Sequence, residues 1–411
     1  MSRHGRPVVR SSSTVMVDWC VNEITGRNPI PAAYLADLER ISIVILSRSR
    51  PDFLLRQVAA WAGLPTRVII MDGSDYPLEE KAREFIAGTA NVEYRHRPVG
   101  IAERLREVSG FLVTPFTVLL GDDEFFLASG LVAAIRRLDE DDGLAGCIGQ
   151  SLIFRPVGGG SRWVYDIAYP HWRYCRAEES VEDRLVAAFD PYTPVTPYAV
   201  LRTPVWARSW GSVDEWTCSA AIEVQMAIGV LASGRVEAVD AVQWLRSVEN
   251  PPVDGEDRKL SFVPWWQLPD RQDEHDRFVS AVAAGVEEGA SVDPATAERM
   301  TRRAIDSYVS YVESRWRIRP STWRVVGHDV AGRARKTCVR MLGRILGDRG
   351  LLGFRRIRVR FLEALGRPQV GYLGTFDEVG RRAPELMVRA NPALGEELAE
   401  LDRMLVSFHR Q

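Results

Sequence analysis

The chain has 411 residues, of which 46% are hydrophobic and 26% charged, with a formal net charge of -2. These values are typical of a globular protein with room for two or three domains, and they exclude a disordered chain. The near-neutral charge gives no overall attraction to nucleic acid or to an anionic surface. The five cysteines are scattered without a C-x-x-C pair, so we expect neither a zinc cluster nor a disulfide framework.

The first 40 residues show no sustained period, and we expect a loose N-terminal arm with a short helix near 33–38. From residue 41 onward, short apolar runs predict buried strands, and amphipathic stretches between them predict helices. Strands are expected at 41–46, 68–71, 92–94 and 116–120, and helices beginning near 51, 77 and 101. This alternation predicts right-handed crossovers and a mostly parallel sheet, that is, an α/β domain.

Polar loops follow three of these strands. Ser47 and Arg48 follow the first strand, residues 72–75 follow the second, and Gly121-Asp122-Asp123-Glu124, here called the acidic loop, follows the fourth. Ligands of parallel sheets bind outside the carboxyl ends of the strands, so we expect a nucleotide site here. An acidic run is usually only solvated, but its position at this edge favours a site for a divalent cation and a diphosphate.

The second half of the chain has a different pattern. Residues 151–250 are mixed, with a helix expected at 220–232 and an extended run at 235–245. Residues 251–272 are rich in Pro, Asp and Trp and indicate a linker or covering loop. Residues 273–411 indicate a mainly helical C-terminal region. No apolar run is long enough for a membrane span or a signal sequence, and we expect a cytoplasmic protein.

Several spaced motifs occur together in residues 41–250. They are Arg48-x-Arg50-Pro51, Met71-Asp72-Gly73-Ser74-Asp75, Tyr94-x-His96-x-Pro98, Thr114-Pro115-Phe116 and the acidic loop followed by Phe125-Phe126. In this order they resemble the GT-A-fold glycosyltransferases of the family 2 type, especially the bacterial branch with a G-D-D-D-F-F-like loop. The resemblance implies a GT-A-type domain over 41–250 and a hexosyltransferase-like enzyme. Such an enzyme moves a sugar from a nucleotide-diphosphate sugar, expected to be a UDP-sugar, to an acceptor hydroxyl with inversion.

The resemblance also implies roles for single residues in nucleotide binding. Asp72 matches the carboxylate that reads the nucleobase, and Ser47 and Arg48 lie where the base is held. Arg104 matches a basic residue that approaches the nucleotide or the donor sugar. From the residues alone, Asp72 could instead cap a turn, and Arg104 could belong to a solvated helix face.

The acidic loop matches the family's D-x-D motif. In that motif one carboxylate usually meets the ribose and another meets a metal ion. We assign Asp122 to the nucleotide and Asp123 and Glu124 to Mn²⁺ or Mg²⁺. Glu124 departs from the family pattern by its longer side chain.

A general base is expected in the second half of the domain. In inverting relatives a carboxylate near the start of a helix deprotonates the acceptor hydroxyl, eleven residues before a glycine and a further strand. Glu223 has this spacing to Gly234, with Asp214 and Glu215 as alternatives and an exposed helix residue as the plainer interpretation. Many metal-dependent relatives also have a histidine after that strand. Arg246 stands there instead and could bind a diphosphate directly, with weaker metal dependence or impaired catalysis as the consequence.

The C-terminal region is locally basic. Residues 301–368 contain 17 Lys/Arg against 5 Asp/Glu, interleaved with apolar residues. This pattern suits a helical domain packed on the core or peripheral contact with the inner face of a membrane, and no nucleic-acid recognition motif accompanies it.

Other functions stay open at this point. The main alternative is a non-catalytic nucleotide-binding or membrane-surface interaction protein of the same fold. A nucleotidyltransferase is disfavoured by the absence of a glycine-rich phosphate loop, and an NAD-dependent enzyme by the absence of G-x-G-x-x-G. The acceptor, which could be a glycan, a lipid-linked glycan, a peptide or a small molecule, is not determined by the sequence.

Overall fold

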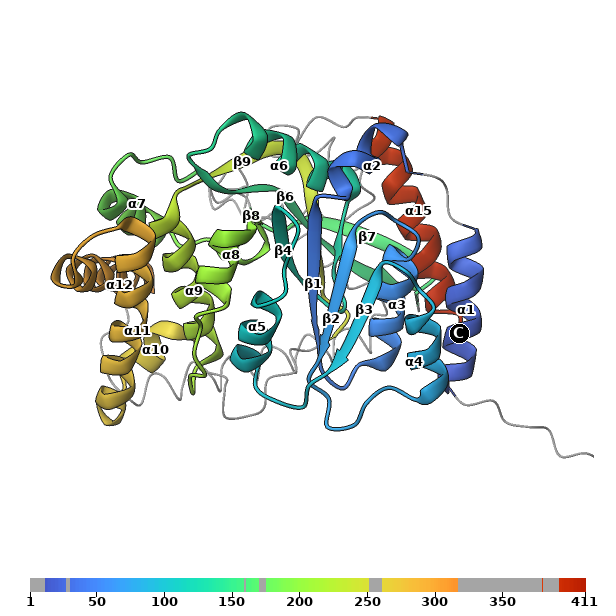
Figure 1. The fold of residues 1–411 in the computed structure, drawn as a ribbon, viewed down its shortest axis with the longest axis horizontal. Coiled ribbons are helices and arrows are strands. Elements are labelled where there is room, and N and C mark those ends of the chain that lie inside the picture. The colour runs from blue at the N-terminus through green and yellow to red at the C-terminus, as the bar shows by residue number, and fades with distance from the viewer. Residues whose placement is uncertain are drawn as a thin grey trace, which may run out of the picture.

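The computed structural model describes residues 12–26, 30–158, 160–169, 175–250, 261–316, 379 and 392–411. Within these residues a nine-stranded sheet has the order β3-β2-β1-β4-β8-β6-β9-β5, and β7 pairs with β6 (Figure 1). The strands are β1 (Ile41–Ser47), β2 (Arg67–Asp72), β3 (Val92–His96), β4 (Phe116–Gly121), β5 (Phe125–Phe126), β6 (Leu144–Val157), β7 (Arg162–Ile167), β8 (Val200–Arg202) and β9 (Arg235–Ser247).

Most neighbouring strands of the first half run parallel. Strand β1 pairs in parallel with β2 and β4, and β2 pairs in parallel with β3. Further along the sheet β6 and β9 are parallel, whereas β8 is antiparallel to both β4 and β6. Strands β5 and β7 are also antiparallel to their partners. The predicted α/β class with a mostly parallel sheet is confirmed.

The helices cover both faces of the sheet (Figure 1). They are α1 (Ser12–Thr25), α2 (Ala32–Leu38), α3 (Pro51–Trp61), α4 (Glu80–Ala87), α5 (Ile101–Ser109), α6 (Ala128–Glu140), α7 (Val181–Ala188), α8 (Thr203–Trp210), α9 (Ser219–Ser233), α10 (Phe262–Trp266), α11 (Gln272–Ala290), α12 (Pro294–Trp316) and α15 (Pro392–Phe408), with 3₁₀ turns at Thr196–Tyr198 and Pro269–Arg271.

Alternation along the buried strands produces two hydrophobic cores. In β1 the side chains of Ile43 and Ile45 join one core and Val44 joins the other, because successive side chains of a strand point to opposite faces. The first core includes α1, α3, α6 and α15, and the second includes α5, α8, α9 and α11. Both faces of the sheet are therefore covered, and its ligand-binding edge is left at the strand ends.

The N-terminal segment differs from the predicted loose arm. Residues 12–25 form α1, which lies against α3 and α4, and Trp19 and Cys20 are buried. Met16, Trp19, Cys20 and Glu23 recur at spacings of three and four, which is a helical stripe that the Ser-rich start obscured. The predicted short helix near 33–38 corresponds to α2.

The C-terminal helices pack in two places. Helices α10, α11 and α12 pack on the α9 side of the molecule, whereas α15 lies next to α1 on the opposite side (Figure 1). Where a covering loop was expected, residues 262–266 form α10, and Phe262 and Trp265 are buried in the second core. Residues 251–260 and most of the basic stretch at 301–368 lie outside the described residues. None of the described helices has the length and hydrophobicity needed to cross a lipid bilayer.

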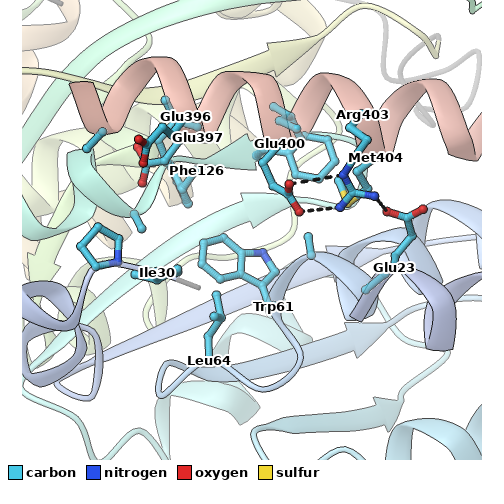
Figure 2. Close-up of a pocket in the computed structure, with 18 residues that line it drawn as sticks. Glu23, Ile30, Trp61, Leu64, Phe126, Glu396, Glu397, Glu400, Arg403 and Met404 are labelled. Atoms are coloured by element: carbon cyan, nitrogen blue, oxygen red, sulfur yellow. Dashed lines mark hydrogen bonds and ion pairs between the residues drawn. The ribbon is translucent and has the colours of Figure 1, made fainter. Parts of the chain in front are cut away.

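Helix α15 is attached by polar contacts as well as apolar ones. Arg403 pairs with Glu23 of α1 at 3.0 Å and with Glu400 of its own helix (Figure 2). Glu397 accepts a hydrogen bond from the backbone N–H of Ser129 at 2.8 Å, and so caps the N-terminus of α6. The cavity of about 510 Å³ shown in Figure 2 lies between α15 and α3 and has an apolar floor that includes Trp61.

Candidate active site

One cleft brings most of the predicted site residues together. It has a volume of about 820 Å³ and opens at the carboxyl ends of β1 and β4. Its lining includes Ser47, Arg48, Arg104, Asp122, Asp123, Glu124, Glu223 and Arg246. Asp72 lines an adjoining pocket of about 290 Å³, which shares Ser47 and Arg50 with the cleft. The second half of the domain therefore brings Glu223 and Arg246 into the same cleft as the acidic loop.

Helix α3 holds the backbone of the acidic loop. Gln57 Nε2 donates to the carbonyl oxygens of Asp122 at 3.1 Å and Glu124 at 2.6 Å, and Arg56 donates to the carbonyl of Asp123 at 3.1 Å. Both α3 side chains are fully buried. The backbone carbonyls of all three acidic residues thus have side-chain partners. These hydrogen bonds fix the backbone of the loop, and with it the positions from which the three carboxylates extend.

The carboxylate of Asp122 faces β1 and the start of α3. Its two oxygens accept hydrogen bonds from Ser47 Oγ at 2.8 Å and from Arg50 at 3.0 Å. Burial raises the pKa of Asp122, although the Arg50 charge and the Ser47 hydroxyl oppose the shift. Pro51 is well suited to the first position of α3, and Arg50, the N-cap residue before it, lies beside the loop.

Asp123 and Glu124, the two predicted metal ligands, have different surroundings. Asp123 contacts Arg50 at 3.3 Å and Asn250 at 3.2 Å, and its side chain is 15% exposed. Glu124 is buried and accepts a hydrogen bond from the indole N–H of Trp244 at 3.0 Å. Burial, together with the Asp123 charge, raises the pKa of Glu124 to about 8 against the opposing indole hydrogen bond.

These surroundings bear on whether the loop fits a metal. In the described part of the chain no three His, Cys, Asp or Glu side chains cluster in a way that could hold a metal by themselves. Mg²⁺ sites commonly use only one or two carboxylates, and phosphate oxygens and water complete the octahedron. Asp123 fits that requirement. Glu124 also lines the cleft, but the burial that raises its pKa disfavours the charged form, so its role as a metal ligand stays a prediction.

Asp72 organises the loops at the strand ends. Its Oδ1 accepts from the backbone N–H and the hydroxyl of Ser74, and its Oδ2 accepts from Tyr94 Oη at 2.7 Å. Ser74 Oγ in turn accepts from the backbone N–H of Ser49, a residue with a positive φ of 58°. The carboxylate is buried, yet Oδ2 has capacity for a further hydrogen bond, so both the turn-capping and the base-reading interpretations are compatible with it.

Arg104 is not on a solvated face. It is buried and donates to the carbonyls of Ser47 at 2.9 Å and Met71 at 2.8 Å, which ties the ends of β1 and β2 together. A Cβ at Gly73 would come within 2.5 Å of its guanidinium carbon, so only glycine leaves room for this side chain. Burial lowers the pKa of Arg104, against the nearby Asp72 charge.

Glu223 lies in α9 on the other side of the cleft. Its carboxylate accepts a hydrogen bond from Tyr192 Oη, and the ring of Tyr192 packs against Tyr308 and Phe189 at centroid distances of 4.9 and 5.1 Å. Burial raises the pKa of Glu223, and the Tyr192 hydrogen bond and the Arg246 charge oppose that rise. A carboxylate with a raised pKa is a stronger base at neutral pH than an ordinary glutamate.

Arg246, at the end of β9, is an exposed cation between the two sides. Its Nη1 donates to Tyr169 Oη at 3.1 Å. Partial burial of the side chain would lower the pKa of Arg246, but the nearby Tyr169, Glu124 and Glu223 outweigh burial and raise it. The guanidinium is thus electrostatically coupled both to the acidic loop and to Glu223, where it could meet an anionic group held between them.

The alternative bases Asp214 and Glu215 do not line the cleft. Asp214 pairs with the exposed Arg106 at 3.4 Å. Glu215 accepts from the backbone N–H of Ala102 at 2.8 Å, in the first turn of α5. The structure thus brings Glu223, but neither alternative, into the cleft with the acidic loop.

Sequence reasoning missed the residues that support the site. They are Arg50, Arg56, Gln57, Tyr192, Trp244, Glu249 and Asn250. One signal was available, because Gln57 is polar yet lies on the apolar stripe of its helix between Leu54 and Trp61. A polar residue at a core position implies a buried hydrogen-bond partner.

No protein-family model matches the chain, and no curated protein matches it. Among solved structures, TarS 1-349 from S. aureus is similar with a TM-score of 0.46 and 10% identity over 90% of both chains, as is its complex with UDP. The complex with UDP-GlcNAc gives a TM-score of 0.45 and 10% identity over 67% of this chain and 74% of that chain. Values this low carry no functional assignment.

Proposed function

We propose that this protein is a glycosyltransferase that moves a sugar from a nucleotide-diphosphate sugar, expected to be a UDP-sugar, to an acceptor hydroxyl. One observation carries the proposal. One cleft, at the carboxyl ends of the strands of a mostly parallel sheet, contains both the acidic loop and the carboxylate of Glu223. Buried hydrogen bonds hold the loop, and burial raises the pKa of Glu223. Arg246 lies between them.

The acidic-loop side suits the nucleotide. Ser47 and Asp122 lie next to the pocket that contains Asp72, so a base in that pocket would leave its ribose near Asp122. Arg48, whose side chain is 58% exposed, and Arg246 provide cations that can move to a diphosphate. Arg104 orders the strand ends beneath the nucleotide and is assigned a supporting role.

The Glu223 side suits the acceptor. In an inverting transfer the acceptor hydroxyl oxygen attacks the anomeric carbon, a new C–O bond forms, and the bond from that carbon to the β-phosphate oxygen breaks. Glu223 takes the hydroxyl proton, and the nucleoside diphosphate leaves with the electron pair. Arg246 stabilises the charge that develops on the leaving diphosphate.

Asp123 would hold Mg²⁺ or Mn²⁺ together with phosphate oxygens, and Glu124 is the candidate for a second ligand. When bound, the metal would supply additional positive charge to the leaving diphosphate. Because Arg246 already provides one cation there, we expect a weaker dependence on metal than in an enzyme that relies on the ion alone.

The test is calorimetric titration of UDP, GDP, ADP and dTDP, each with and without Mn²⁺, into wild type and Asp123→Ala. We expect one nucleotide to bind and to bind more weakly without metal and in the variant. Failure of all four to bind at millimolar concentration would remove the support for a nucleotide-sugar enzyme. Binding without any turnover of a panel of UDP-sugars would favour the non-catalytic alternative.

A further inference from the structure

A chain of polar contacts joins the C-terminal residues to the acidic loop through two buried side chains, those of Glu249 and Arg56. His409 Nε2 contacts Glu249 Oε1 at 2.8 Å, and Glu249 pairs with both terminal nitrogens of Arg56 at 3.1 and 2.9 Å. Arg56 then donates to the carbonyl oxygen of Asp123 at 3.1 Å. The order of contacts is therefore His409, Glu249, Arg56 and Asp123, here called the buried relay.

The centre of the relay is shielded from solvent, whereas the side chain of His409 at its outer end is 25% exposed. The side chain of Arg56 is 0% exposed and that of Glu249 is 3% exposed. The Arg56 guanidinium lies 4.7 Å from the ring of Phe408 and also faces the rings of Phe53 and Phe125. A buried ion pair is held well only when its remaining lone pairs and protons have partners, and His409, the residue that follows α15, provides one of those partners.

The charge state of Glu249 sets the direction of its hydrogen bond with His409. Burial by itself would raise the pKa of Glu249, but the hydrogen bond from His409 and the Arg56 charge outweigh it, and the pKa is lowered. The glutamate is thus an ionised acceptor, and His409 must donate. Ser247 Oγ also donates to the carboxylate, at 3.0 Å.

We propose that His409 is a positioning residue for the acidic loop: it fixes Glu249, which fixes the Arg56 guanidinium that holds the carbonyl of Asp123. Helix α15 then belongs functionally to the nucleotide side of the cleft, although it lies at the far end of the sequence. The purpose of this positioning, to aim Asp123 at a diphosphate or its metal, rests on the function proposed above.

Helix α15 offers a matched control. Arg403 lies on this helix and joins it to α1 through Glu23, and none of its hydrogen bonds or ion pairs among the described residues is with Glu249, Arg56 or Asp123. Loss of Arg403 therefore weakens the attachment of α15 without touching the acidic loop. His409→Gln is the conservative variant, because it keeps an N–H donor for Glu249.

The first measurement needs no ligand. Hydrogen–deuterium exchange is followed in peptides that cover residues 119–127 in wild type, His409→Ala, His409→Gln and Arg403→Ala. We expect exchange in this segment to be about tenfold faster in His409→Ala, the factor for one lost net hydrogen bond, with recovery in His409→Gln and no change in Arg403→Ala. Equal exchange in His409→Ala and wild type, or an equal increase in Arg403→Ala, would overturn the inference.

The second measurement is the dissociation constant of UDP with Mn²⁺ in the same proteins. We expect about tenfold weaker binding in His409→Ala than in Arg403→Ala, with rescue by His409→Gln. If wild type binds UDP and His409→Ala binds it equally well, the positioning role is wrong while the proposed function stands. If wild type binds none of the four nucleotides, the proposed function fails, and the exchange experiment still decides whether His409 positions the loop.

Discussion

The two sides of the cleft are built in different ways. On the acidic-loop side, side chains from β1, α3 and β9 hold the carbonyls and carboxylates of residues 122–124 through buried hydrogen bonds. On the Glu223 side, one carboxylate has a tyrosine partner, Tyr192, whose ring packs against the rings of Phe189 and Tyr308. The hydrogen bonds on the acidic-loop side fix the positions of the loop's carboxylates before a ligand binds. The surroundings of Glu223 set the basicity of its carboxylate. A diphosphate needs the former and an attacking hydroxyl needs the latter.

The largest expected effect tests the Glu223 side. Glu223→Gln removes the proton acceptor and should lower transfer by about 10²- to 10⁴-fold, because a general base contributes that much. UDP affinity should stay within about twofold, since the nucleotide is held on the other side. The measurement is initial-rate transfer or hydrolysis of a UDP-sugar, with calorimetry of UDP.

Glu288→Gln, an exposed carboxylate on α11, is the control for the loss of a negative charge. If Asp214→Asn or Glu215→Gln abolished turnover while Glu223→Gln retained it, the assignment of the base would be wrong.

The next largest effect tests the ion pair between Arg56 and Glu249, which supports the acidic loop. Glu249→Leu leaves the fully buried Arg56 without its counter-charge and should lower the free energy of unfolding by about 3–5 kcal/mol. The double variant Arg56→Met/Glu249→Leu should lose less, because no unpaired charge remains. Urea denaturation of the single and double variants measures the difference. A double variant less stable than Glu249→Leu would contradict this account of the pair.

A smaller effect tests the contribution of Arg246 to UDP binding. Arg246→Gln should weaken UDP binding in the absence of metal by about 10- to 150-fold, which corresponds to the roughly 1.5–3 kcal/mol of a charge-assisted hydrogen bond. Saturating Mn²⁺ should reduce the loss, because the ion supplies replacement charge. Calorimetry with Arg277→Gln, an exposed arginine of α11 outside the cleft, is the comparison. Equal UDP affinity of Arg246→Gln and wild type without metal would remove Arg246 from the nucleotide site.

The smallest effect concerns pH. Glu223 must be ionised to accept a proton, so turnover should rise with pH through its raised pKa, about tenfold per pH unit on the acidic limb. The Tyr192 hydrogen bond and the Arg246 charge favour the ionised form, so Tyr192→Phe and Arg246→Gln should each move the limb to higher pH. The pH profile of kcat/KM measures these shifts. A shift toward lower pH in Tyr192→Phe would contradict the assigned hydrogen bond.

The sequence was sufficient for the part of the fold that depends on local pattern. The apolar runs at 41–46 and 116–120 became β1 and β4, and the loops after them came together at the cleft because parallel strands end at one edge. The spacing to Gly234 in the resembling family singled out Glu223, which lines the cleft, while its role as the base stays a prediction. The helix at 12–25 was missed because its apolar stripe follows a Ser-rich start.

The supporting contacts could not be predicted in the same way. Arg56 meets Glu249 from a position 193 residues away in the sequence, and no periodicity encodes such a distance. Nothing in the sequence pattern marks Trp244 as a site residue, whereas its indole N–H donates to the carboxylate of Glu124. Which buried polar side chains become partners depends on tertiary packing. A single sequence shows only local patterns, which do not contain that information.

The contact between His409 and Glu249 also has a consequence for biosynthesis. The two residues are 160 positions apart, and a ribosome adding about 5–20 residues per second needs roughly 8–32 s to pass from one to the other. During that interval the sheet, Arg56 and the acidic loop have already been made, but the histidine that completes their buried pair has not. A nascent chain paused before its last helix therefore exposes the Arg56–Glu249 pair to solvent and to chaperones.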